Sequence, residues 1–227
     1  MPATISDFTN LVLPPDIRTV FLDLDNTCYI YEPCSLAART AVASTITDIV
    51  GPLPDFQTRY EAAQEVVKAR IPTHGSSHNR ALYFQTLFEQ LGRTDGHIHA
   101  DQLETVYWEA FFTIMKPVAG LVDFLAQCQQ NDTTVVVVSD LTASIQCEKM
   151  RRLSIADFVH YLVTSEEAGA DKPNHIMFEL ALMKASAAAA STLMIGDSET
   201  KDITGARALG IHTILIRHED LSHPSPL

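Results

Sequence analysis

The sequence has 227 residues, of which 46% are hydrophobic and 19% are charged, and its formal net charge is −12. This length allows one large domain or two modest ones, and the composition is that of a globular protein. The acidic balance argues against a nucleic acid polymer or an anionic membrane as the main partner, because both require a basic surface. Small anionic metabolites remain open as partners.

The cysteines and the N-terminus indicate a cytoplasmic protein. The four cysteines show no CxxC spacing, so neither a zinc site nor a redox pair is predicted, and reduced thiols fit best. The N-terminal MPATISDFTN has neither the basic nor the apolar region of a signal peptide. No apolar stretch approaches the length of a membrane span. No pattern indicates the oligomeric state.

The first predicted strand is an apolar stretch that ends in a pair of carboxylates. Residues 1–18 are expected to form an irregular arm, because two successive prolines block a helix there. The sequence TVFLDLDNT at 19–27 then begins as a buried strand and ends at Asp23 and Asp25. Burial of two like charges is costly unless they are paired or bind a metal, so this stretch indicates a functional site.

A long block of helical pattern follows, from Pro33 to Phe112. It predicts four helices, the first of which has Ser35 as its expected N-cap. Tyr83, Phe84 and Phe88 are expected in the core of this block rather than in a binding platform. Four helices of this length form a small bundle.

After the helical block, strands alternate with helices. Four further strands are predicted at 133–138, 161–163, 192–195 and 212–216. This alternation indicates an α/β fold with a parallel sheet and right-handed crossovers. The α/β core is expected at 1–32 and 113–227, with the helical bundle of 33–112 inserted as a cap. An insertion after the first strand is expected to cover the sheet edge at which α/β proteins bind ligands.

Charged and hydroxyl side chains follow the predicted strand ends, and parallel strands bring such residues to one edge. They are Asp23, Asp25, Ser139, Lys172, Asp197 and Asp202. Four carboxylates with only one lysine to compensate them would repel one another unless a cation joined them or some carboxyls stayed protonated. Ligands with oxygen donors alone suit Mg²⁺. A serine and a lysine beside that ion suit a phosphate group, which Ser139, Lys172 and loop N–H groups could bind.

This ordered set of residues resembles the haloacid dehalogenase (HAD) superfamily, in its phosphatase branch with an inserted helical (C1-type) cap. DLDNT at 23–27, VVVVS ending at Ser139, Lys172 in DKP, and GDSETKD at 196–202 look like its four motifs. The resemblance covers residues 19 to 216 and implies a Rossmann-like parallel sheet, the HAD fold. The DLDNT form and the cap type look similar to nucleotidase-like relatives.

The resemblance implies Mg²⁺-dependent hydrolysis of a small phosphomonoester through an aspartyl-phosphate. Asp23 would be the nucleophile, and Asp25 would protonate the leaving oxygen and then activate water. Mg²⁺ would be held by Asp23, the Asp25 carbonyl and Asp197, while Asp202 would orient Lys172 or a water on the metal. The substrate would be a small phosphorylated metabolite, with a nucleoside monophosphate and a sugar phosphate both open.

Three residues and two rival functions also stay open. Asp140 stands where many relatives have Asn, and an ionised carboxylate cannot donate a hydrogen bond to phosphate. His78 and Arg80 are candidate substrate contacts in the cap, with a solvated surface position as the alternative. A phosphomutase of the same architecture, or a receiver-like signalling domain that accepts a phosphoryl group, would use the same residue types. The long helical insertion disfavours the receiver domain.

Overall fold

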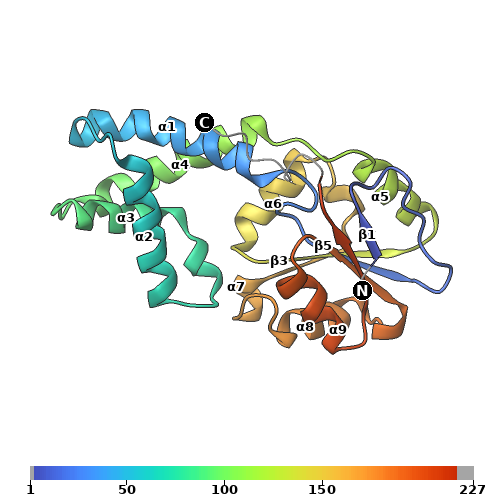
Figure 1. Cartoon of the computed structure of the whole chain (residues 1–227). Helices are drawn as coiled ribbons and strands as arrows, with labels where there is room; N and C mark the ends of the chain where they lie inside the picture. Colours follow the sequence, from blue (N-terminus) through green and yellow to red (C-terminus); the bar gives the residue numbers. More distant parts are fainter. Residues whose placement is uncertain (1–2, 219–227) are drawn as a thin grey trace. The chain divides into compact units, whose positions relative to one another are not determined.

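The computed structural model describes residues 3–218, and the chain forms two compact units (Figure 1). The core unit runs to Ile30 and resumes at Lys116, whereas the helical unit is the continuous segment Tyr31–Met115. The helical pattern of the sequence, at 33–112, is slightly shorter than this unit. The chain therefore leaves the core unit once, after Ile30, and returns to it once, at Lys116.

The core unit contains a six-stranded sheet in the order β1-β6-β5-β2-β3-β4. All five strand pairings are parallel, which confirms the predicted α/β fold with a Rossmann-like sheet. The strands are β1 (Ala3–Ile5), β2 (Thr19–Leu22), β3 (Thr134–Ser139), β4 (Tyr161–Thr164), β5 (Thr192–Gly196) and β6 (His212–Ile216). The strand β2 is central, because it pairs with β5 on one side and with β3 on the other.

Burial on both faces of the sheet explains why β2 and β3 have uninterrupted apolar sequences. Phe21 of β2 pairs with Val136 of β3 and with Met194 of β5, and all three side chains are fully buried. The helices α8 (His175–Ala185) and α9 (Gly205–Ala208) contribute to the same hydrophobic cluster and pack together (Figure 1). This core fixes the ends of the central strands, where the polar residues begin.

Further helical segments surround the sheet in the core unit, together with the 3₁₀ turns Ala156–Phe158 and Ala189–Ser191. The helices are α5 (Leu121–Gln130), α6 (Ala143–Arg152) and the short α7 (Ser165–Ala168), and a π-helical turn spans Glu199–Thr204. α5 contacts β3, and α6 contacts β4. The π-helical turn leads directly into the short helix α9, so that only Gly205–Ala208 is α-helical there.

The edge strand β1 was not predicted. Residues 1–18 were expected to form an irregular arm, but Ala3–Ile5 pairs with Ile214–Ile216 of β6. The strand has only three residues, and none of them is fully buried. Neither an apolar run nor an alternating pattern therefore marks it in the sequence.

The helical unit contains four long helices, as the sequence predicts. They are α1 (Tyr31–Val50), α2 (Phe56–Arg70), α3 (Arg80–Gln90) and α4 (Gly96–Ile114), with the 3₁₀ turn Gly75–His78 before α3. Tyr83, Phe84 and Phe88 are fully buried, which confirms their expected place in the core of this unit. Among residues 3–218, no helix is both long and apolar enough to span a membrane.

The predicted N-cap of the first helix is wrong. The helix α1 begins at Tyr31, so Ser35 lies inside it and is buried. Pro33 occupies the first turn of α1, where the missing backbone N–H has no helical partner to lose. The Ser35 hydroxyl instead lies 3.2 Å from the hydroxyl of Tyr107, which ties α1 to α4.

Candidate active site

Three of the predicted site residues lie at the carboxyl ends of neighbouring central strands. Asp23 follows β2, Ser139 is the last residue of β3, and Asp197 follows β5. The Asp23 amide donates to the Ile195 carbonyl oxygen at 3.0 Å, so the pairing with β5 continues one residue past the strand. Asp23 is thereby fixed at the sheet edge with only 5% of its surface exposed.

Lys172 joins this group through its ammonium, which makes three hydrogen bonds. The Nζ atom lies 2.6 Å from Asp23 Oδ1, 2.7 Å from Asp202 Oδ1 and 2.9 Å from the Val138 carbonyl oxygen. An ammonium has three N–H donors, so the protein itself satisfies all of them. Lys172 therefore neutralises and orients Asp23 directly, and its predicted contact with phosphate stays a prediction.

The carboxylates of this site have perturbed protonation equilibria. Burial raises the pKa of Asp23 well above its usual value, and repulsion from Asp202 and Asp197 adds to this, although Lys172 opposes it. Burial and the charge of Asp202 raise the pKa of Asp197 to about 6. Within the protein alone, the negative charge of the cluster exceeds what Lys172 compensates.

The donor set of the cluster fits a magnesium ion. Asp23, Asp197 and Asp202 each offer a carboxylate oxygen, and these oxygens lie within 4.8 Å of one another. Hard oxygen donors and an excess of negative charge are what Mg²⁺ binds. Asp202 already has partners on both oxygens, since Oδ1 accepts from Lys172 and Oδ2 accepts from the Ser198 amide at 3.0 Å. Asp202 thus holds Lys172 through Oδ1, and its predicted role beside the metal stays a prediction.

The close approach of Asp202 to the end of β5 depends on Gly196. A Cβ atom on this residue would lie 2.5 Å from Cγ and 2.6 Å from Cβ of Asp202. Real side chains do not approach one another so closely, so any other residue would displace Asp202. The absence of a side chain at Gly196 thus allows Asp202 of the π-helical turn to pack against the end of β5.

Ser139 is oriented by a residue that the sequence analysis missed. Gln146 of α6 is fully buried, and its Nε2 donates to Ser139 Oγ at 2.6 Å and to the Asp140 carbonyl oxygen at 2.8 Å. The Ser139 hydroxyl hydrogen has a distant acceptor, the Asp140 carbonyl oxygen at 3.5 Å. A phosphate oxygen would therefore be a better acceptor for Ser139 than its present one.

Asp140, whose role the sequence left open, connects three loops. Its Oδ1 accepts from the backbone amide of Lys172 at 2.9 Å, and its Oδ2 lies 2.8 Å from Lys201 Nζ. An asparagine could not form the same ion pair with Lys201. The carboxylate thus stabilises the loops that present Ser139 and Lys172.

A model of the haloacid dehalogenase-like hydrolases matches residues 58–216, which is most of the chain. The chain belongs to the haloacid dehalogenase-like hydrolases. Its similarity to ribulose-1,5-bisphosphate 5-phosphatase of Halopiger xanaduensis is 33% identity over 86% of the chain and 83% of that protein. Its similarity to glyceraldehyde 3-phosphate phosphatase of Methanopyrus kandleri is 31% identity over 88% of the chain and 84% of that protein.

A solved structure shows the same fold. The 2-haloacid dehalogenase of Pseudomonas syringae superimposes with a TM-score of 0.74 at 21% identity, and the match covers 93% of this chain and 90% of that chain. Together with the two relatives, the family model confirms the predicted HAD-type phosphatase, an enzyme that hydrolyses phosphate monoesters.

Two further residues of this HAD phosphatase were missed, and both contact Asp25. Lys149 Nζ lies 2.6 Å from Asp25 Oδ1, and the Tyr29 hydroxyl donates to the same oxygen. Gln146 and Lys149 are three residues apart on α6 and therefore share one face of that helix. That spacing alone did not mark them in the sequence, because polar residues on one helix face are ordinarily solvated.

Arg80 lies inside the helical unit, so the solvated alternative for it is wrong. Its exposed fraction is 4%, and its Nη2 donates to the Tyr31 hydroxyl at 2.7 Å. Its guanidinium carbon lies 5.1 Å from the ring centroid of Tyr107 and 4.9 Å from that of Trp108. His78 is half-buried, and its carbonyl oxygen accepts from Arg80. Contact of either residue with substrate stays a prediction.

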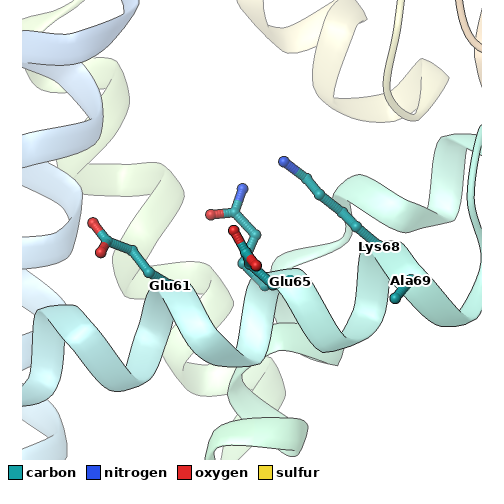
Figure 2. Close-up of a pocket in the computed structure, with 5 residues that line it drawn as sticks. Glu61, Glu65, Lys68 and Ala69 are labelled. Atoms are coloured by element: carbon teal, nitrogen blue, oxygen red, sulfur yellow. The ribbon is translucent and has the colours of Figure 1, made fainter.

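The helical unit also has a shallow hollow along α2 (Figure 2). It is lined by Glu61, Gln64, Glu65, Lys68 and Ala69, all from this helix. The two glutamates disfavour an anionic phosphate ester in this hollow. We therefore place no step of the reaction there.

Proposed function

We propose that this phosphatase hydrolyses its ester through an aspartyl-phosphate on Asp23. The observation that favours this most is the contact of Lys172 with Asp23, at 2.6 Å, inside a cluster of buried carboxylates. A buried, hydrogen-bonded carboxylate at a fixed strand end, kept ionised by a bound metal ion, is suited to be a nucleophile. A purely structural ion pair would not require two further carboxylates beside it.

The reaction then has two halves. An Asp23 oxygen forms a bond to phosphorus while the ester bond breaks, and the leaving oxygen takes a proton from Asp25. Asp25 next takes a proton from water as that water attacks the phosphoryl group, which regenerates Asp23. Lys172 holds Asp23 in place in both halves. Ser139, held by Gln146, donates to a phosphoryl oxygen.

Magnesium is the proposed cofactor. Asp23, Asp197 and the carbonyl oxygen of Asp25 would hold the ion, and Asp202 would act beside it by orienting Lys172. When bound, Mg²⁺ would compensate negative charge on the phosphoryl group and on the carboxylates.

For the substrate we propose a phosphate ester of a small hydroxylated carbonyl compound. Ribulose 1,5-bisphosphate and glyceraldehyde 3-phosphate, which appear in the names of the two relatives, are both of this class. A nucleoside monophosphate is the alternative that the resemblance of the DLDNT motif favours. The core-unit residues address only the phosphoryl group, so we assign discrimination between substrates to the helical unit, with His78 and Arg80 as candidates.

The test is phosphate release from a panel of sugar phosphates, triose phosphates and nucleoside monophosphates, with Mg²⁺, with Ca²⁺ and with EDTA. We expect release with Mg²⁺, none with EDTA, and little with Ca²⁺, which accepts looser geometry. An acid-quenched sample should contain phosphorylated Asp23, detected by mass spectrometry. An isomerised ester without free phosphate would indicate a phosphomutase, and a stable phosphoprotein without turnover would indicate a receiver domain.

A further inference from the structure

Lys149 is a buried cation for which the reaction described above provides no role. It lies on α6, its side chain is 0% exposed, and its Nζ is 2.6 Å from Asp25 Oδ1. Transfer of an ammonium from water into a protein interior is strongly unfavourable unless partners compensate for it. Asp25, by contrast, has 30% of its side chain exposed. The cation is therefore the buried member of the pair, and the carboxylate is the member that reaches toward solvent.

Tyr29 supplies a second donor to the same oxygen. Its hydroxyl donates to Asp25 Oδ1, and a backbone bridge between Asp25 and Tyr29 holds the two residues together. The Tyr29 ring is fully buried, and Lys149 Nζ lies 5.7 Å from its centroid. Ring, ammonium and carboxylate thus form one packed cluster, in which the position of Asp25 Oδ1 is fixed from two directions.

Two donors are what one carboxyl oxygen can accept in the plane of the group. With Lys149 and Tyr29 both donating to Oδ1, a proton on that oxygen would have to displace one of them. A protonated Asp25 therefore has its hydrogen on Oδ2. The side chain is held with one oxygen as a fixed acceptor and the other as the acid.

We propose that Lys149 and Tyr29 are positioning residues that fix Asp25 so that Oδ2 delivers the proton to the leaving oxygen. This proposal rests on the proposed function. As an Asp23 oxygen bonds to phosphorus, the electron pair of the breaking ester bond goes to the leaving oxygen, which takes the Oδ2 proton. Asp25 is left as a carboxylate, and the ammonium of Lys149 is already in place to stabilise the negative charge that develops.

The test varies only the leaving group. Phenyl phosphate and p-nitrophenyl phosphate have similar size, but phenolate leaves poorly without a proton, whereas p-nitrophenolate leaves readily. The ratio kcat/KM includes every step up to departure of the leaving group. For Lys149→Met we expect kcat/KM to fall at least about 10-fold for phenyl phosphate and to stay within about threefold for p-nitrophenyl phosphate.

Two further variants complete the experiment. Tyr29→Phe keeps the buried ring and removes one donor, so it should give a smaller shift in the same direction even if Lys149→Met does not fold. Lys184→Met is the matched control: this lysine pairs with Glu167 at 2.6 Å in the same unit and has no contact with the site described above. It should leave the preference between the two esters unchanged.

The outcomes separate this inference from the proposed function. If the wild-type protein releases phosphate, two results would overturn the positioning role. One is an equal loss of kcat/KM on both esters in Tyr29→Phe and in Lys149→Met, and the other is no loss on either ester in both variants. Absence of phosphate release from both esters by the wild-type protein with Mg²⁺ would overturn the proposed function and this inference with it.

Discussion

At the scale of single residues, Asp23 is placed for reactivity at a cost in stability. Its pKa is raised by burial and by repulsion from Asp202 and Asp197. An acid with a higher pKa in the folded state than in the unfolded state favours folding when it is protonated. The raised pKa of Asp23 therefore destabilises the metal-free protein at neutral pH, where this carboxyl is ionised in the unfolded state, and the destabilisation diminishes as the pH falls through the pKa of the folded state toward that of the unfolded state.

The variant Asp23→Asn tests the role of this residue in turnover and its effect on stability together. We expect turnover to fall by more than about 100-fold, because an amide cannot form the acyl phosphate. In EDTA at neutral pH, the midpoint of thermal unfolding should be equal to or above that of the wild-type protein, as measured by circular dichroism. A lower midpoint would mean that the ion pair of Asp23 with Lys172 stabilises the fold more than repulsion destabilises it.

The site residues differ in how far the sequence could predict them. Asp23, Ser139 and Asp197 lie at the ends of apolar strands, so the chain order alone brings them to one sheet edge. Lys149 gives no such signal, because a lysine in the last turn of a helix is ordinarily a solvated, dipole-compensating residue. Its burial depends on how α6 packs, which is a tertiary contact that no local pattern encodes.

Among contacts between elements, the one between β5 and the π-helical turn leaves the least space for a side chain at position 196. Gly196→Ala should displace Asp202 and with it Lys172, because the added Cβ would lie 2.5 Å from Asp202 Cγ. We expect kcat to fall about 10-fold or more and the free energy of unfolding to fall by about 1–3 kcal/mol. Phosphate release and urea unfolding measure the two effects.

A matched control for Gly196→Ala is Gly210→Ala. Gly210 has a φ of +79° and no heavy atom within 4 Å of the Cβ that would be added. An alanine there would be strained by its backbone conformation, so stability should fall by about 1 kcal/mol while kcat is retained. If both variants lost activity equally, general destabilisation would explain the loss and the role of Gly196 would be contradicted.

In the helical unit, Arg80 connects the 3₁₀ turn before α3 to the aromatic residues of α4. Arg80→Ala should lower the free energy of unfolding of this unit by about 2–5 kcal/mol, because it removes a buried side chain and its ring contacts. Trp108, the single tryptophan of the chain, reports this unfolding by fluorescence in urea.

The control for Arg80→Ala is Arg59→Ala on α2. Arg59 is partly exposed and pairs with Asp55 at 2.7 Å one helical turn away. Loss of such a pair should change stability by less than about 0.5 kcal/mol. An equally small change for Arg80→Ala would contradict the packing role that its burial indicates.

The secondary structure could be predicted where burial and apolar pattern agree. The four valines of β3 and the apolar run of β2 were recognisable because both faces of those strands are covered. The edge strand β1 and the start of α1 were not, since exposed pairing and a proline in a first turn leave no apolar signature. Packing partners, rather than local propensity, determine where β1 forms and where α1 begins.

At the scale of the whole molecule, the division into two compact units predicts two responses to metal. All proposed magnesium ligands belong to the core unit. Magnesium at 100 times its Kd should stabilise this unit by about 2.7 kcal/mol, and the unfolding transition of Trp108 in the helical unit should not move. Calorimetry and tryptophan fluorescence, each with Mg²⁺ and with EDTA, measure the two units separately.

Two results would contradict this prediction. If Mg²⁺ shifted neither transition, the assignment of the carboxylate cluster as a metal site would be wrong. If it shifted both equally, the two units would unfold as one cooperative structure rather than separately.

The strand order also determines when the enzyme can assemble on the ribosome. The central strand β2 is made early, but its neighbours β3 and β5 begin only at Thr134 and Thr192. The helical unit lies between them as one continuous segment, and domains fold as units while the chain is synthesised. Translation thus completes the inserted unit first. The strand β2, which precedes Asp23, stays unpaired until β3 and then β5 have been synthesised.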